Sequence, residues 1–270
     1  MIRLYDSAFS PFARKVRIVL ALKGLAHEVV DGLALANRQL LAEVNGRVEV
    51  PALEHDGVVV VGSSDIAQYL ERMSPTPSLY PQDRGEWVRA RAWERCADTL
   101  VDGALINISY WAWAERSDHM PDGMLEAARR DMEQVYEALE RDLDGHSFVC
   151  GQLSIADIAL FPHLTATKSL GVGHDPERHP KVHAWLKRLR ALAPFAADLE
   201  RARAFVATFT TQQAGTETHE RKKIFWRGDR LEWVLARGFH GWLSKEIAED
   251  RVLWPGLGIP GPRRQRDSIV

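Results

Sequence analysis

Two serines stand where a side chain can stabilise negative charge, because each immediately precedes a stretch of helical type. Ser10 is followed by Pro11, and Ser is a favoured helix N-cap while Pro is favoured at the first helical position. Ser63 opens the second such stretch, with Ser64 beside it. A hydroxyl next to the free N–H groups and positive end of a helix can bind an anion. Both serines are also explained as plain helix caps, so the residues alone leave the two interpretations open.

The cysteines and histidines exclude other common catalytic centres. Cys96 and Cys150 are far apart, and the chain has no other cysteine. A disulfide scaffold is therefore excluded, as is a zinc or redox site built on a C-x-x-C pair. Position 13, three residues after Ser10, is Ala13, so neither place of a C-x-x-C reductase holds a thiol. No H-E-x-x-H run occurs among the ten histidines, and we predict no metal.

Length and charge narrow the class of protein further. The 270 residues suggest about two domains, and 46% hydrophobic residues suffice for a core. Lys plus Arg is 35 and Asp plus Glu is 37, so the net charge of −2 argues against a general nucleic-acid binder. The sequence contains neither an apolar run of about 18 residues, which a membrane helix needs, nor a signal-peptide stretch at its start. We therefore predict no membrane association, and a reducing, cytoplasmic location.

The elements that position the two serines follow from the pattern of the first 80 residues. The spacing predicts a strand from Ile2, a helix from Pro11 to the stop at Gly24, a strand around 28–30 and a short helix over about 35–44. Two apolar runs then flank Asp56-Gly57, the strongest short hairpin signal, and a helix follows from Ser63. The order strand, helix, strand, helix, hairpin, helix is the thioredoxin-like arrangement.

The rest of the chain is predicted to be helical. A linker rich in Pro and Ser covers 74–78. Helices are expected over about 87–115, 122–143, 179–192 and 194–205, with another after the capping-box pattern from Ser154 to Asp157. Apolar residues near helical spacing predict one amphipathic helix over about 229–249, packed back on the helical domain, before an irregular tail. We predict an α/β domain over 1–78, an all-α domain over 84–205 and an extension over 206–270.

Four motifs, in order and at matching spacing, resemble those of the cytosolic glutathione transferases. They are Ser10-Pro11-Phe12-Ala13, Val50-Pro51, Ser63 followed by the helix through Leu70, and the segment from Gly151 to Asp157. The resemblance covers about residues 1–205, and its first motif is of the serine type found in zeta-like members, where omega-like members carry Cys. The chain departs from the family at Gly62, where an acidic residue is usual. It departs again in the turn over 45–51, where Pro and Gly are displaced.

The resemblance implies a role for each residue of the first domain that we single out. Ser10 would be catalytic: its hydroxyl would donate to the thiolate of glutathione, whose free thiol has a pKa of about 8.5. The glutathione-binding residues would be Phe12, Arg38, Val50, Pro51, Ser63 and Ser64. In particular, the backbone of Val50 before a cis-Pro51 would pair with the cysteinyl part of the ligand, as in strand addition.

The two carboxylates and the ammonium group of the ligand would have separate partners. Ser63 and the helix that it opens would bind the γ-glutamyl carboxylate. Arg38 would bind the glycyl carboxylate, although an exposed helix Arg is a common alternative. Asp65 could bind the ligand ammonium group in place of the missing acid at Gly62, or serve only as a partner of the helix dipole.

A second substrate, a small hydrophobic electrophile, would lie between the two domains. Asn107, Tyr110 and Trp113 fall near the end of the first long helix, where the family's pocket forms, and Tyr110 and Trp113 share a face. Core or dimer packing explains them equally well. The family also implies a homodimer and a role in detoxification, with glutathione as cosubstrate.

Two alternatives to a transferase remain from the sequence. One is a non-catalytic protein-interaction module of the same fold, which Gly62, the altered turn and the extension favour. The other is a glutathione-dependent isomerase or dehalogenase of zeta-like type, which would share Ser10 and differ only in substrate.

Overall fold

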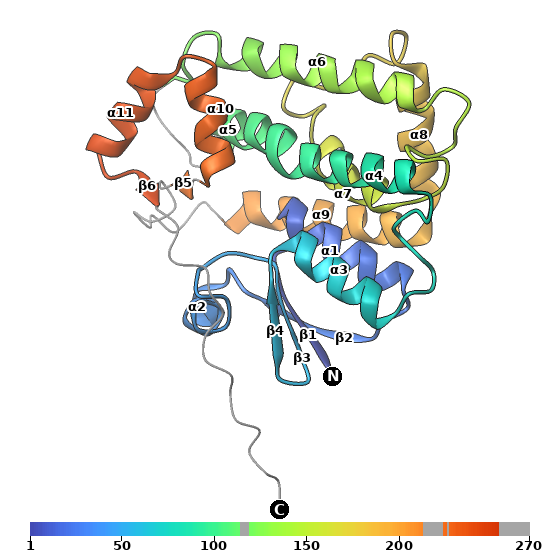
Figure 1. Ribbon diagram of the computed structural model, residues 1–270. Coiled ribbons are helices and arrows are strands. Elements are labelled where there is room, and N and C mark those ends of the chain that lie inside the picture. Colours follow the sequence, from blue (N-terminus) through green and yellow to red (C-terminus); the bar gives the residue numbers. More distant parts are fainter. Residues whose placement is uncertain (114–118, 213–223, 226, 254–270) are drawn as a thin grey trace, which may run out of the picture. The chain divides into compact units, whose positions relative to one another are not determined.

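The computed structural model describes residues 1–113, 119–212, 224–225 and 227–253, and these form two compact units (Figure 1). The first unit comprises Met1–Tyr80 and Leu192–Thr208, and the second comprises Pro81–Ala191 and the described part of Phe209–Pro255. The predicted irregular tail lies, from residue 254 onward, outside the described residues.

The first unit has the predicted element order. Its elements are β1 (Ile2–Asp6), α1 (Pro11–Leu22), β2 (His27–Asp31), α2 (Arg38–Asn45), β3 (Ala52–His55), β4 (Val58–Val61) and α3 (Ser63–Met73). The sheet order is β2-β1-β3-β4, with β1 and β2 parallel and the other neighbours antiparallel (Figure 1). The thioredoxin-like fold class is therefore confirmed.

Local sequence signals account for the positions of the turns. Asp56 and Gly57 both have positive φ, 48° and 80°, as a two-residue hairpin turn requires, and His55 pairs with Val58 across it. Helix α2 ends at Gly46, whose φ of 72° is left-handed. Gly46 ends α2 before the segment that contains Val50, and the turn at Asp56-Gly57 leads through β4 to Ser63 at the start of α3.

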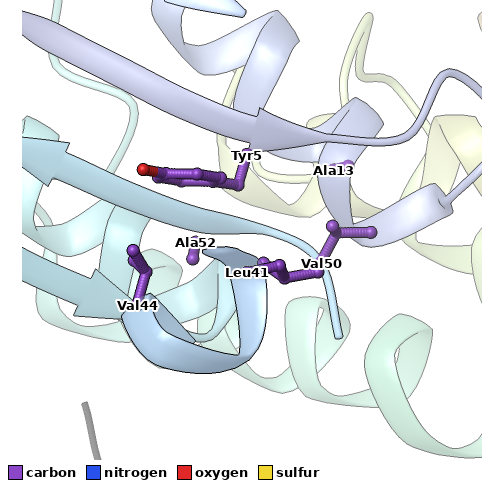
Figure 2. Packing of buried hydrophobic residues seen from close by; sticks show 6 residues of the cluster. All are labelled: Tyr5, Ala13, Leu41, Val44, Val50 and Ala52. Carbon is purple, nitrogen blue, oxygen red and sulfur yellow. The ribbon is translucent and has the colours of Figure 1, made fainter. Parts of the chain in front are cut away.

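A small apolar cluster joins the sheet to α1 and α2. Its buried members are Tyr5, Ala13, Leu41, Val44, Val50 and Ala52 (Figure 2). Gly32 belongs beside this cluster, because a Cβ there would lie 2.9 Å from Val50 Cγ1 and 3.2 Å from Leu41 Cδ2. Because Gly32 has no side chain, its backbone can lie this close to the Val50 side chain.

One further helix, α9 (Ala193–Gln212), contributes its first part to this unit. Phe195 is fully buried, and the Asp198 side chain is buried against α1, where it forms ion pairs with Arg14 and Arg17. Charged as well as apolar contacts therefore hold this helix within the unit.

The second unit is helical, as predicted. It contains α4 (Arg84–Cys96), α5 (Asp102–Trp113), α6 (Met124–Asp142), α7 (Ile155–Leu164) and α8 (Pro180–Ala191). The helix expected over about 87–115 is α4 and α5 joined by a π-helical segment, Ala97–Val101. It begins at Arg84 because Asp83 caps it, accepting a hydrogen bond from the Glu86 amide at 3.0 Å.

The predicted capping box is present at the start of α7. Asp157 is fully buried and accepts bonds from the Ser154 amide at 2.9 Å, the Val149 amide at 3.1 Å and Trp185 Nε1 at 2.8 Å. Four hydrogen bonds, including one from the Ser154 hydroxyl, satisfy this buried carboxyl group.

The prediction of a single helix over 229–249 was wrong, because two helices occupy this range. They are α10 (Gly228–Ala236) and α11 (His240–Ala248), and Gly238 between them has a φ of 84°. A left-handed residue ends a helix, so Gly238 separates the two rather than only weakening one. The expected packing on the helical domain is confirmed: a Cβ at Gly103 of α5 would lie 3.3 Å from the Trp233 Cβ of α10. Short strands β5 (Ile224–Phe225) and β6 (Val252–Leu253) pair on either side of these helices.

Candidate functional site

Ser10 stands at the N-terminus of α1 with its hydroxyl toward the helix end. Its backbone is extended (φ −62°, ψ 121°), Pro11 follows it, and Oγ accepts a hydrogen bond from the Ala13 amide at 3.4 Å. The first turn of α1 contains no acidic residue, so no side chain there offsets the positive end of the helix dipole. Because Oγ acts as an acceptor toward the helix, its hydrogen is left to donate to an anion.

Val50 and Phe12 lie in the wall beside this N-terminus. Phe12 and Val50 are each 7% exposed, and Val50 packs in the same cluster as Ala13 of α1 (Figure 2). Pro51 is buried, and the Val50–Pro51 peptide bond is cis. The predicted pair is therefore brought next to the first turn of the helix that Ser10 caps.

The start of α3 forms the second part of the site. Ser63 is 6% exposed, and Ser64 Oγ accepts a hydrogen bond from Lys15 Nζ at 3.1 Å. Lys15 belongs to α1 and is 1% exposed. A buried ammonium group therefore lies at the N-terminal turn of α3, where its charge adds to the positive end of that helix.

Gly62 and Asp65 share the space in front of this turn. Gly62 has a φ of 85°, which disfavours any residue with a side chain, and a Cβ built there would lie 3.5 Å from Asp65 Oδ2. The exposed carboxylate of Asp65 thus reaches the place where a side chain at position 62 would begin.

Arg38 is held at the start of α2. Its Nε donates to the Leu33 carbonyl at 3.3 Å, and the neighbouring Asn37 donates from Nδ2 to the Asp31 carbonyl at 2.8 Å. Arg38 is partly exposed. The structure therefore places Arg38 in the first turn of α2, with its side chain bonded to the loop before that helix.

The residues predicted for the second substrate lie on α5 and are covered. Asn107 and Tyr110 are both fully buried. Asn107 Nδ2 donates to the Gly103 carbonyl at 2.8 Å and to the Arg230 carbonyl of α10 at 3.2 Å, while its Oδ1 has no hydrogen-bond partner among the described residues. The side chain of Trp113 is outside the described part of the chain. The C-terminal segment therefore covers Asn107.

Burial disfavours the thiolate form of both cysteines. Burial raises the pKa of Cys150 to about 12, and burial likewise raises the pKa of Cys96. The thiolate is the reactive form of a thiol, so the surroundings of neither cysteine activate it.

Three histidines meet in the second unit, and two of them, His179 and His183, form an H-x3-H pair that was overlooked when no metal was predicted from the sequence. His179 and His183 are four residues apart; His183 Nδ1 lies 3.3 Å from His174 Nε2, and His179 Nε2 lies 3.4 Å from Glu133 Oε1. In the described ranges, no group of three or more His, Cys, Asp or Glu side chains could hold a metal ion. Nor is any helix of those ranges long and apolar enough to span a bilayer.

Sequence reasoning missed the charged side chains that α1 buries. Arg14, Lys15 and Arg17 are 4%, 1% and 7% exposed, and Asp198 of α9 pairs with both arginines. The available signal was the interleaving of these residues with Val16, Ile18 and Val19, which leaves α1 without a polar face.

Comparisons with known proteins find relatives for both units. The family model described as "Glutathione S-transferase, N-terminal domain" matches residues 4–78, and "Glutathione S-transferase, C-terminal domain" matches 112–188. The chain is 30% identical over 197 residues to glutathione S-transferase L3 of Arabidopsis thaliana, covering 69% of this chain and 77% of the relative. It is 31% identical over 202 residues to maleylacetoacetate isomerase of Rattus norvegicus, covering 71% and 89%.

A solved structure extends the comparison to the fold. The glutathione S-transferase of Methylobacillus flagellatus, crystallised with glutathione bound, superposes with a TM-score of 0.64 at 25% identity. The match covers 73% of this chain and 98% of that one. The part of the chain left over in each comparison is thus about the length of the predicted C-terminal extension.

Proposed function

The chain belongs to the glutathione S-transferase family of transferases, and we propose that it activates glutathione through Ser10 for attack on a small hydrophobic electrophile. The observation that carries this proposal is the position of Ser10 at the uncompensated N-terminus of α1. A hydrogen bond to a charged group stabilises it by about 1.5–3 kcal/mol, which lowers a thiol pKa by about one to two units.

The chemical step requires little more than this thiolate. The sulfur forms a bond to the electrophilic carbon, the electron pair of the broken bond leaves with the departing group, and the thiol proton passes to water. Neither cysteine of the chain competes, since burial raises the pKa of both. Ser10 is therefore proposed as the one catalytic residue, and no metal is required.

Four groups of the first unit are proposed to hold the peptide part of glutathione. The backbone of Val50 pairs with the cysteinyl residue, with Phe12 and Pro51 as the wall around it. Ser63 and Ser64 receive the γ-glutamyl carboxylate at the N-terminus of α3, and Arg38 is the proposed partner of the glycyl carboxylate. The buried ammonium of Lys15, 3.1 Å from Ser64 Oγ, supports an anion at this helix end.

Asp65 is proposed to replace the acid that the family usually carries at position 62. Its Oδ2 lies 3.5 Å from where a Cβ of residue 62 would be, so its carboxylate is available to the same ligand ammonium group. Asp65→Asn should therefore weaken glutathione binding. It should leave unchanged the affinity for an analogue lacking the amino group, and calorimetry with both ligands tests this.

The pocket for the second substrate stays a proposal, and the burial of its residues restricts the size of the electrophile. Asn107, Tyr110 and Trp113 are still the proposed lining, but Asn107 and Tyr110 are buried and Asn107 is bonded to α10. An electrophile that contacts them must therefore be small, or α10 must move. The domain boundaries 1–78, 84–205 and 206–270, homodimerisation, a cytoplasmic location and a role in detoxification likewise stay predictions.

The first experiment is glutathione binding by calorimetry, with the wild type and Ser63→Ala. Binding that is weakened in the variant supports the ligand site, and no detectable binding at several millimolar glutathione favours the interaction module instead. Ser10→Ala should then raise the pKa of the bound thiol, followed by thiolate absorbance, by about one to two units. An unchanged thiol pKa would remove Ser10 from the mechanism.

An isomerase is the second candidate, because a maleylacetoacetate isomerase is among the relatives at 31% identity. Such an enzyme would use the same Ser10 thiolate, adding it to a double bond and releasing it after rotation. Glutathione is regenerated in an isomerisation and consumed in a conjugation, so its concentration during turnover separates the two.

A further inference from the structure

The loop that leads into Ser10 is held by a buried guanidinium group. After β1 ends at Asp6, Ser7, Ala8 and Phe9 connect it to Ser10, whose amide donates to the Ser7 carbonyl at 3.2 Å. Arg17 of α1 donates to two carbonyls of this loop, from Nη1 to Ser7 at 3.2 Å and from Nη2 to Ala8 at 3.1 Å. The backbone just before Ser10 therefore depends on how Arg17 is oriented.

Two buried carboxylates fix that orientation. Asp6 accepts from Arg17 Nη1 at 2.7 Å, and Asp198 of α9 accepts from Nη2 at 2.7 Å and Nε at 3.2 Å. The side chains of Arg17, Asp6 and Asp198 are 7%, 0% and 2% exposed. Little water is available to replace a lost partner.

These contacts use the whole donor capacity of the side chain. A guanidinium group has five N–H donors. Those of Arg17 are directed at Asp198 twice, at Asp6, and at the Ser7 and Ala8 carbonyls. Since Asp198 receives two of the five, its loss leaves the guanidinium plane held by Asp6 and the two loop carbonyls alone.

We propose that Asp198 is a positioning residue for Ser10, acting through Arg17 on the carbonyls of Ser7 and Ala8. This inference rests on the proposed catalytic role of Ser10, and it assigns to α9, far along the chain, a part in activating the thiol. Asp198 also binds Arg14 Nε at 2.9 Å, so α9 is bonded to α1 at two points.

The test compares the thiol of bound glutathione in the wild type and in Asp198→Asn. The carboxamide keeps the shape but has one acceptor oxygen in place of two, so either Arg17 or Arg14 loses its acceptor here, and the loss of the negative charge weakens any bond to Arg17 that remains. The pKa of the bound thiol should rise by about one unit, a tenfold change in the thiolate equilibrium. At acid pH the thiol is protonated in every variant, and there the affinity for glutathione should change less than about threefold. The reason is that Ser63 and Val50 are not bonded to Arg17 or to the two carboxylates that hold it.

Arg201→Gln is the matched control. Arg201 also pairs with Asp6, at 3.1 Å, but it is 45% exposed and contacts neither loop carbonyl by any recorded bond. Its loss should leave the thiol pKa unchanged. If Asp198→Asn does not fold, Arg17→Lys replaces it, because lysine keeps the charge but not the planar fork.

A double-mutant cycle separates positioning from general damage. In the Ser10→Ala background, Asp198→Asn should have no further effect on the thiol pKa, because the group it positions is absent. Additive effects, or a thiol pKa unchanged by Asp198→Asn, would overturn the inference. If Ser10→Ala alone has no effect, it is the proposed function that fails.

Discussion

Replacing Asp131 with alanine should loosen α10 on the helical unit. Asp131 of α6 is 5% exposed and accepts from Trp233 Nε1 at 2.8 Å, Arg237 Nη2 at 2.7 Å and Arg237 Nε at 3.0 Å. This hydrogen bonding raises the pKa of Arg237. One carboxylate thus connects α6 to the middle and to the end of α10.

The expected loss follows from what each partner faces afterwards. The indole N–H of Trp233, a residue 4% exposed, would be left buried without an acceptor, at a cost of about 1–3 kcal/mol. The Arg237 side chain is 33% exposed and can be rehydrated, so its ion pair contributes about 0.5–1 kcal/mol. The sum is about 1.5–4 kcal/mol, or a fall in Tm of about 3–16 °C.

Thermal and urea unfolding measure the total loss of stability in Asp131→Ala, and amide hydrogen exchange shows which helix has lost it. Exchange should accelerate most in α10, and Trp233→Phe with Arg237→Gln should divide the loss between the two partners. The matched control is Glu126→Ala, which removes an exposed ion pair to Arg129 on the same helix and should change stability by less than about 0.5 kcal/mol. An Asp131→Ala loss no larger than this control would refute the reasoning.

Two further predictions concern the same unit. Gly103→Leu should destabilise by about 1–3 kcal/mol in thermal unfolding, because a Cβ there already lies 3.3 Å from Trp233 Cβ. Gly228→Ala, with nothing within 4 Å of the added carbon, should be neutral or stabilising by up to about 1 kcal/mol. Burial, with a smaller effect from His183, lowers the pKa of His174 below its ordinary value of 6.5. Between the lowered pKa of the folded protein and 6.5, the unfolded chain binds more protons at this residue than the folded protein does. The free energy of unfolding should therefore fall as the pH drops through this range. Urea unfolding from about pH 8 to about pH 5 should show a weaker pH dependence in His174→Gln.

Local signals were enough to predict the first unit. Asp56-Gly57 gave a two-residue turn with positive φ at both positions, and Ser10-Pro11 gave a helix start. Such signals depend on a few neighbouring residues, so they can be recognised without knowing the tertiary contacts of the chain. They also predicted that helices begin at Ser10-Pro11 and at Ser63, as α1 and α3 do.

The helical unit was predicted less completely, because its details depend on contacts distant in sequence. The π-helical segment Ala97–Val101 has no local signal that separates it from the α-helices on either side. Gly238 was read as a weak point within one helix, and only its φ of 84° distinguishes a break from a tolerated glycine.

The buried carboxylates were the largest omission at the site. On the sequence, Asp198 and Asp131 are ordinary acids on helices with charged faces, and such residues are usually solvated. Their partners, Arg17 and Arg237, lie 181 and 106 residues away. An ion pair of that separation is decided by tertiary packing, so residue type and spacing alone cannot predict it.

The covering of Asn107 has a physical cause in the composition of α5. Of its twelve residues, Asp102 alone is charged, and a helix that is apolar all round needs partners on every side. Asp102 itself accepts from Arg230 Nε at 2.8 Å, which ties α10 to the start of α5. Deleting α10 would therefore expose apolar surface and leave the buried Asp102 carboxylate, among the described residues, with only the longer pairing to Arg227, at 3.4 Å. A truncated chain that loses activity would thus report on the stability of α5, and only point changes such as Asp131→Ala can show whether α10 limits access to Asn107.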